Sequence, residues 1–323
     1  MGNCCTNKNI EPDSPDAKIL SSEKGLTSVH TKGPINENQL LPFSKIQTQI
    51  PGKKVDMMLT PTIKVLEIDM KKGYFKPDPK IDQEFIGLQV CGPIKLEDGA
   101  TYQGQLKNGK RHGFGRQVWP NGSVYEGYWK NDQCNIKGRF IHPQGDFYEG
   151  EWLNDQTSGH GIYDHPDGTR YVGQWKNDEQ NGLGEEKWPD GSVYVGQFMN
   201  SMKHGKGKQV WADGSVYEGE FKDNNIQGIG TYTWSDGKVY KGTWLDNKMN
   251  GRGEFTWPNG NKYYGEYVND QKCGYGEFFW EDGRAYKGQW KDDKQDGEGK
   301  FYTLDGTVKA GIWANGHRIS WKN

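Results

Sequence analysis

Histidines are the first residues to consider for chemistry, since imidazole serves both as a metal ligand and as a general acid or base. The chain has seven of them. His112 and His204 occupy a position of a repeating pattern that other segments fill with Asn135, Ser158 and Asn181. No pair of histidines keeps a metal-binding spacing. The pattern therefore indicates solvated loop residues, and we expect no catalytic residue, no metal and no other cofactor.

Other residues with reactive or ligand-binding side chains also fit structural roles better. Asp-Gly pairs recur, but without the glycine-rich nonapeptide spacing of calcium-binding repeats. Gly-Xaa-Gly also recurs, but no helix follows it, as a phosphate-binding loop requires. The cysteines, at positions 4, 5, 91, 134 and 273, form no disulfide or zinc pattern. A reducing cytosolic compartment fits this usage best, and the chain is not expected to be an enzyme.

The N-terminus carries a pattern for covalent acylation. The chain starts Met1-Gly2-Asn3-Cys4-Cys5-Thr6, which fits the N-myristoylation pattern with Gly2 as the acceptor. One myristoyl chain binds bilayers only marginally, at roughly 10⁴ M⁻¹, so stable attachment requires a second signal. No cluster of basic residues follows to supply it. We therefore expect palmitoylation of Cys4 and Cys5; an unmodified exposed tail is the alternative.

Charge and hydropathy exclude two further classes of protein. The chain has 41 basic and 43 acidic side chains, with no block of either sign, so no nucleic acid partner is expected. No apolar run approaches the roughly 18 residues that a membrane span requires. The 46 glycines and low hydrophobic content are poor for an ordinary globular core.

A fixed period of 23 residues organises the chain. Tyr-Xaa-Gly begins at residues 102, 125, 148, 171, 194, 217, 240, 263 and 286, and a degenerate copy begins at residue 309. A period of this length is typical of an array in which each unit contacts its neighbours. Residues 90–323 are therefore expected to form one body.

Each period predicts two short antiparallel strands. In residues 217–239, Tyr217, Gly219 and Phe221 alternate with charged residues, as in a strand with one solvated face. A second alternating run spans residues 228–234, and Ser235-Asp236-Gly237 is a hairpin-turn signal. Glycine inside a strand is costly, so its regular use predicts that aromatic rings of the adjacent strand lie across it. The fold class is all-β, an elongated single-layer antiparallel β-solenoid of tandem 23-residue hairpins.

The repeating residues resemble the MORN repeat (membrane occupation and recognition nexus). The match is close in residues 102–122, YQGQLKNGKRHGFGRQVWPNG, and recurs through Gly288. Ile136 departs from it, because it replaces the first glycine of Gly-Xaa-Gly. The resemblance implies a rod-like solenoid with an aromatic groove, and end-to-end or side-by-side homodimers. Some MORN proteins carry a catalytic domain, but the sequence continues for only about a dozen residues after its last repeat, so none is expected here.

The chain thus divides into an acylation signal at residues 1–6, a largely disordered tether at residues 7–89 and the repeat array at residues 90–323. The tether is rich in Lys, Asn, Pro, Ser and Gln, although apolar pieces such as Ile63–Ile68 could pair with a sheet edge or a partner. Residues 90–99 are expected to cap the first edge of the array. At its other end, a closing hairpin is expected from Gly311, Trp313, Gly316 and Trp321.

The predicted aromatics have two interpretations, as the core of the sheet or as a groove for a protein partner. The candidate groove residues are Tyr125, Trp129, Tyr217, Trp234, Tyr240 and Trp257. The leading hypothesis is a non-enzymatic scaffold, lipid-anchored to the cytoplasmic leaflet of the plasma membrane or to the cell cortex, that binds protein partners. The alternatives are a ciliary or cortical cytoskeletal component, and a phospholipid-binding or lipid-kinase regulatory module.

Overall fold

The computed structural model describes residues 63–322 of the 323-residue chain. The predicted acylation sites Gly2, Cys4 and Cys5, and the tether up to residue 62, lie outside the described residues. Chain contacts divide the described residues into two units, which comprise residues 63–202 and residues 203–322.

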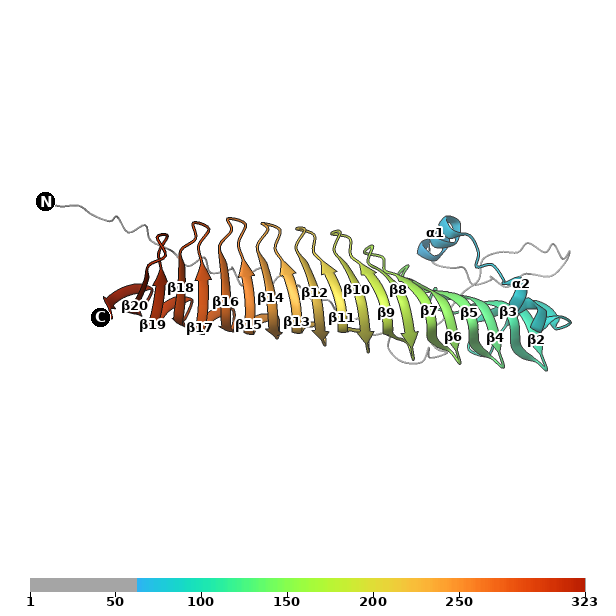
Figure 1. The fold of residues 1–323 in the computed structure, drawn as a ribbon. Helices are drawn as coiled ribbons and strands as arrows, with labels where there is room; N and C mark the ends of the chain where they lie inside the picture. The colour runs from blue at the N-terminus through green and yellow to red at the C-terminus, as the bar shows by residue number, and fades with distance from the viewer. Residues whose placement is uncertain (1–62, 323) are drawn as a thin grey trace. The chain divides into compact units, whose positions relative to one another are not determined.

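The first unit has three short helices followed by ten strands, each paired antiparallel with the next along the chain (Figure 1). Its elements are α1 (Ile63–Lys72), α2 (Pro79–Asp82), the 3₁₀ helix η3 (Gln83–Phe85), β1 (Gln89–Lys95), β2 (Thr101–Lys107), β3 (Lys110–Val118), β4 (Val124–Lys130), β5 (Gln133–Ile141), β6 (Phe147–Leu153), β7 (Gln156–Asp164), β8 (Arg170–Lys176), β9 (Glu179–Lys187) and β10 (Val193–Met199).

The second unit continues the pattern with eleven strands, again paired antiparallel in chain order. They are β11 (Met202–Val210), β12 (Val216–Lys222), β13 (Asn225–Thr233), β14 (Val239–Leu245), β15 (Lys248–Thr256), β16 (Lys262–Val268), β17 (Gln271–Phe279), β18 (Ala285–Lys291), β19 (Lys294–Tyr302), β20 (Val308–Ala314) and β21 (His317–Trp321). The described residues confirm the predicted all-β class of single-layer antiparallel hairpins.

Two kinds of turn alternate along the strands. The predicted turn at residues 235–237 is a three-residue loop, in which Trp234 C=O accepts from Gly237 N at 2.9 Å and Gly237 has a φ of 86°. The tighter turn lies at the other end of the hairpin, between β12 and β13. There Asp223 and Asn224 have φ values of 49° and 71°, as a two-residue turn with two left-handed residues requires. Asn and Asp adopt this conformation at lower cost than other side chains.

Tyrosine rings fill the space that the strand glycines leave, as predicted. The Tyr217 ring lies on Gly219 of its own strand and on Gly230 of the neighbouring strand, so that a Cβ at either glycine would overlap it. Its hydroxyl donates to Glu220 C=O at 3.1 Å, and Trp244 Nε1 donates to Gly230 C=O at 3.3 Å. Ring packing and satisfied polar tips together make a core within one layer.

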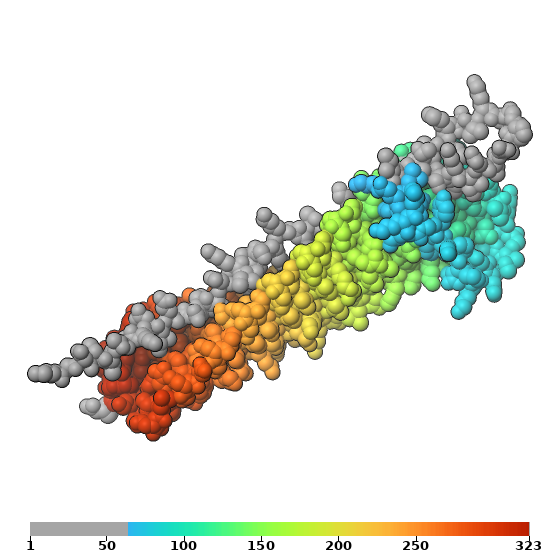
Figure 2. All heavy atoms as spheres, turned by 90° about the horizontal axis from the view of Figure 1, so that it is seen from above, coloured from blue at the N-terminus to red at the C-terminus, as the bar shows by residue number. Residues whose placement is uncertain are grey.

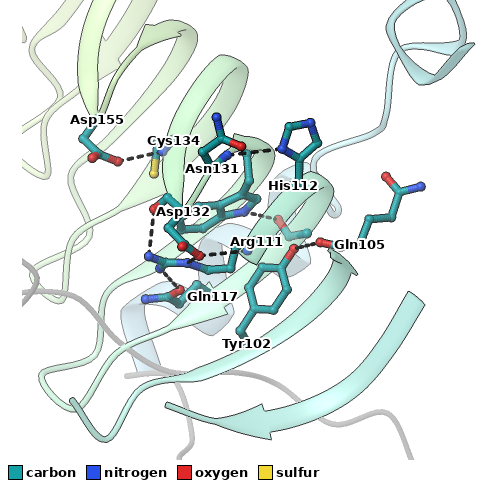
Figure 3. Close-up of polar contacts among 11 residues, drawn as sticks. Tyr102, Gln105, Arg111, His112, Gln117, Asn131, Asp132, Cys134 and Asp155 are labelled. Carbon is teal, nitrogen blue, oxygen red and sulfur yellow. Dashed lines mark hydrogen bonds and ion pairs between the residues drawn. The ribbon is translucent and has the colours of Figure 1, made fainter. Parts of the chain in front are cut away.

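Side chains of the tight turns bond each hairpin to the preceding one. Figure 3 shows this arrangement at the start of the array, where Asp132 Oδ1 accepts from Arg111 N at 2.8 Å and Asp155 Oδ1 accepts from Cys134 N at 2.6 Å. Beside them, the Tyr102 hydroxyl donates to Gln105 C=O at 2.8 Å. The carboxylate thus has two roles, since its residue forms the turn and its oxygen satisfies a backbone donor of the neighbouring hairpin.

At each end of the array the terminal strand pairs with its neighbour through an irregular register. At the first end β1 pairs with β2, with a register shift between Cys91 and Ile94. At the other end β21 pairs with β20, and the Trp313 and Trp321 rings meet edge to face at 5.9 Å. These two hairpins lie where the sequence predicted an end cap and a closing hairpin.

The structure differs from the predicted tether at residues 63–72, which form α1, and at residues 79–85, which form α2 and η3. Strand pairing would leave the apolar Ile63–Ile68 piece at a sheet edge, whereas α1 instead lies on the face of the sheet in the same unit (Figure 2). The reason is the burial of Val65, which has no exposed surface and belongs to one cluster with apolar side chains of four strands.

Candidate functional site

The six candidate groove residues are all buried. The exposed fractions are 0% for Tyr125, Tyr217 and Tyr240, 1% for Trp129, and 8% for Trp234 and Trp257. Tyr125 and Trp129 belong to the first unit and meet edge to face, with ring centroids 4.9 Å apart. Trp129 Nε1 also donates to Gly115 C=O at 3.2 Å. These rings form the core of the sheet and leave little surface for a partner.

His112 and Cys134 are the candidates for chemistry in the first hairpins, and their surroundings favour structural roles. His112 Nδ1 accepts from Asn131 N at 3.3 Å, and burial lowers the pKa of His112, with Lys107 adding to the effect. Burial raises the pKa of the Cys134 thiol, which disfavours a reactive thiolate. Among residues 63–322, no three or more His, Cys, Asp or Glu side chains are arranged to hold a metal ion. The helices of these residues include none with the length and apolar character of a membrane span.

A better candidate surface lies on the opposite face of the first unit. We call residues 63–86 the strap, and we call the side of the sheet that alternates with the tyrosine core the outer face. Because successive strand residues point to opposite faces, Val124, Glu126 and Tyr128 of β4 lie on the outer face. Every residue of β4 except Lys130 is buried, whereas a solvated strand would alternate. The strap covers this part of the outer face.

The first anchor of the strap is apolar. Val65 of α1 packs on a row of outer-face side chains, one from each of four neighbouring strands, and Ile68 packs against the edge of the same cluster. The row consists of Val118, Val124, Ile141 and Phe147, which are cross-strand neighbours. Burying one valine side chain contributes about 1.5–3 kcal/mol.

The second anchor is a charge cluster. Asp69 Oδ2 lies 2.7 Å from Arg116 Nη2, and Arg116 Nη1 lies 3.3 Å from Glu126 Oε1. The side chains of all three residues are less than a tenth exposed. Burial raises the pKa of Glu126, and Arg116 partly offsets this effect. Arg116 thus pairs with two carboxylates, one from the strap and one from the sheet.

Further polar contacts are hydrogen bonds between side chains of the sheet and the main chain of the strap. Side chains of the sheet bond backbone atoms at successive points: Arg139 Nη1 donates to Gly73 C=O at 2.6 Å, Phe75 N donates to Glu126 Oε2 at 2.7 Å, Asp78 N donates to the Tyr128 hydroxyl at 2.6 Å, and Gln105 Nε2 donates to Phe85 C=O at 3.3 Å. Polar side chains of the sheet therefore contact the strap backbone at several points between Gly73 and Phe85.

Aromatic side chains complete the contact near the end of the strap. Phe85 is 5% exposed and packs on Tyr128 and His112, with ring centroids 5.8 Å and 5.6 Å apart. The Tyr128 hydroxyl donates to Asp82 Oδ1 at 2.7 Å. Burial and this bond raise the pKa of Tyr128.

Sequence reasoning missed this surface, although the strands carry a signal for it. A strand with one solvated face should be polar at every second position. Phe114, Tyr128 and Phe147 instead place large apolar rings at outer-face positions. The position of Phe114 is apolar again at Leu183, Ile229 and Tyr275, which are exposed, and the position of Phe147 is Val239 in a later repeat. The position of Tyr128 is instead polar in most other repeats, for example at Glu220, so Tyr128 is the clearest local signal that something covers the outer face there.

The chain is thus a repeat protein built of tandem β-hairpins, with a strap on one face of its first hairpins. A family model for the MORN repeat matches nine consecutive segments, at residues 102–124, 125–147, 148–170, 171–193, 194–216, 217–239, 240–262, 263–283 and 286–308. The chain belongs to the MORN-repeat family. No curated protein matches it.

Several solved structures show weak likeness. The TCP domain of SAS-4 from Drosophila melanogaster, in complex with a proline-rich motif of Ana2, is 16% identical, with a TM-score of 0.32 over 60% of this chain and 97% of that one. The TCP10 domain of CPAP from Danio rerio is 13% identical, with a TM-score of 0.25 over 72% and 99%. Virginiamycin B lyase from Staphylococcus aureus is 10% identical, with a TM-score of 0.14 over 69% and 84%. Values this low support no functional conclusion.

Proposed function

We propose that this chain is a non-enzymatic scaffold, held at the cytoplasmic face of a membrane or at the cell cortex by acyl groups, whose repeats bind protein partners. The observation that carries the scaffold role is the strap on the outer face. There, side chains of the repeats bind the main chain of a helical and extended segment. A surface that recognises one polypeptide segment in this way is suited to recruiting others.

The anchor is proposed from the N-terminal residues. Gly2 is the expected myristoyl acceptor, and Cys4 and Cys5 are the expected palmitoyl acceptors. Either type of chain alone gives weak, reversible attachment, whereas the two together give stable residence. The proposal therefore requires both modifications, and Met1 must be the initiating methionine.

Fractionation of cells expressing variants tests the anchor. The wild-type chain is expected in the membrane fraction, and Gly2→Ala is expected to move it to the soluble fraction, because palmitoylation requires prior contact with the membrane. Cys4→Ser with Cys5→Ser is expected to leave partial, reversible attachment. If Gly2→Ala remained with membranes at the wild-type level, the acyl anchor would be wrong. Retention of the wild-type chain after detergent extraction would favour the cytoskeletal alternative.

Homodimerisation and direct binding of phospholipids by the repeats stay as further hypotheses. Anionic headgroups bind clusters of Lys and Arg, and the composition of the chain is nearly neutral, with 41 basic and 43 acidic residues. We therefore expect that the Gly2→Ala chain does not sediment with phosphoinositide vesicles.

A further inference from the structure

We propose that the outer face of β3–β6 is a docking surface for a helix-and-turn segment of a partner protein, and that the strap is its intramolecular occupant, which the partner replaces. This inference rests on the proposed scaffold function, since it names the surface and the chemistry of the partner. The occupant to which we commit is a segment of another protein with the anchor pattern of the strap.

The contacts make the surface tolerant of different sequences. Arg139, Glu126 and Tyr128 bond the carbonyl or amide groups of Gly73, Phe75 and Asp78. Any segment with the same backbone conformation presents the same N–H and C=O groups, so these hydrogen bonds do not require the sequence of the strap. Recognition of main-chain atoms by fixed side chains is how many peptide-binding surfaces combine affinity with adaptability.

A few side chains set the chemistry of the partner. Val65 fills the apolar row, and Asp69, one helical turn later, pairs with Arg116. The helix then stops at Gly73, which has a φ of 72° and whose N–H donates to Asp69 C=O at 2.8 Å. We therefore expect a short helix with an apolar residue and an acidic residue four positions apart. A glycine follows the acidic residue four positions later and turns the chain into an extended segment.

The strap has the properties of an exchangeable element. Its buried apolar side chains are Val65 and Phe85, and the Asp69 side chain is 8% exposed, whereas Met70, Tyr74 and Ile86 are exposed by 86%, 56% and 80%. The strands beneath it pair with one another through their own backbones, with one register shift between Gly127 and Trp129 of β4. Loss of the strap therefore removes its own anchors and breaks no strand pairing.

Protection of the end of the array does not account for the strap. A solenoid needs a cap on its terminal edge, and β1 supplies it by pairing with β2. The strap lies on a face instead, and its contact residues are local to the first repeats. The row that reads Arg116, Glu126, Arg139 and Glu149 continues as Ile162 and Val172 in β7 and β8. Charged pairs return in the same row of later strands, but there Lys208 and Glu218 are 54% and 70% exposed, whereas Arg116 and Glu126 are 7% and 9% exposed. What distinguishes the first repeats is therefore the burial of the row beneath the strap.

Binding of a labelled synthetic peptide of residues 61–86 to the full-length, unacylated chain tests the proposal. The peptide is expected to bind a chain whose own strap is weakened by Val65→Asp and Asp69→Lys at least about tenfold more tightly than the wild-type chain. Adding Arg116→Glu to the weakened chain is expected to reduce binding by about tenfold or more. A peptide with Asp69→Asn serves as the control ligand and should bind more weakly.

A second test uses a chain in which all the anchor residues of the strap are unchanged. A protease site inserted after Gly87 allows the strap to be cut from β1, after which the labelled peptide should replace it. Peptide that binds neither form would show that the strap is a permanent part of the fold, and peptide that binds equally well after Arg116→Glu would show that binding does not use this surface. Either result would overturn the proposal. Exchange of straps between two wild-type chains, detected as a mixed labelled dimer, would identify a second copy as the occupant and also overturn it. Because no acyl group is present, failure of the lipid anchor does not affect the result.

Discussion

Asp69 of α1 and Arg116 of β3, 47 residues apart in the chain, form an ion pair with Oδ2 and Nη2 2.7 Å apart. The pair is nearly excluded from water, and it joins the strap to the sheet at the point where Arg116 also contacts Glu126. Buried ion pairs depend on both members, because removing one leaves an uncompensated charge.

Arg116→Ala is therefore expected to release the strap. Breaking a buried ion pair costs about 3–5 kcal/mol when both residues stay in place, but the strap can leave and return Asp69 and Glu126 to water. Loss of the ion pair should thus appear as local opening of the strap, with the sheet still folded. Hydrogen exchange at the Phe75 and Asp78 amides, which bond Glu126 and Tyr128, should speed up, while amides of β12–β19 keep their rates. Arg252→Ala is the matched control and should change neither set, because the Arg252 side chain is 87% exposed in its pair with Glu266.

Gly230→Ala should destabilise the second unit through overlap with Tyr217. The new Cβ would fall within the space of the Tyr217 ring, and forcing an extra carbon into a filled core costs about 1–3 kcal/mol. Gly92→Ala is the control, since nothing lies within 4 Å of a Cβ built there and its φ is not left-handed. Denaturant midpoints should fall for Gly230→Ala and stay close to wild type for Gly92→Ala. Equal midpoints would contradict the packing role of the glycine.

The sequence predicts the Tyr217–Gly230 packing because both residues recur at a fixed period, and a single layer has few ways to bury rings. It does not predict the tight turn at Asp223 and Asn224, since the stronger Asp-Gly signal lies at the other end of the hairpin. The strap is missed for a different reason. Its helix depends on burial of Val65 by residues from four strands, which no local pattern in residues 63–72 contains.

Ile136 is a point where the repeat pattern and the backbone disagree. It has a φ of 64°, a left-handed conformation that is unfavourable for a β-branched residue. Other repeats place a glycine at this position, for example Gly228 with a φ of 67°. Ile136→Gly should therefore stabilise the first unit by about 1 kcal/mol, as seen in its thermal midpoint. Ile229→Gly, at an exposed strand position, should lower stability instead. A lower midpoint for Ile136→Gly would show that its side-chain contacts outweigh the strain.

Buried tyrosines should make the fold sensitive to alkaline pH. Burial raises the pKa of Tyr125, Tyr217, Tyr240 and Tyr263 well above the ordinary value of 10.0. The unfolded chain loses these protons near pH 10 and the folded chain keeps them, so the stabilising effect is complete below pH 10 and is lost as pH rises above it. Each buried tyrosine lowers stability by up to about 1.4 kcal/mol per pH unit in that range.

Titration followed by tyrosinate absorbance and circular dichroism measures this effect. The buried tyrosines should ionise in one cooperative step that coincides with loss of the sheet, whereas the urea-unfolded chain should ionise gradually near pH 10. Gradual ionisation of the folded chain with the sheet intact would mean that the rings are open to water.

The membrane-anchored scaffold is tested most directly by the intact mass of the natively expressed protein, before and after hydroxylamine. The account predicts a chain without Met1 that carries one myristoyl group on Gly2. It also predicts palmitoyl mass on Cys4 or Cys5, which hydroxylamine removes because it cleaves thioesters. An N-terminus without either acyl group would contradict the anchor and leave the scaffold to act away from the membrane.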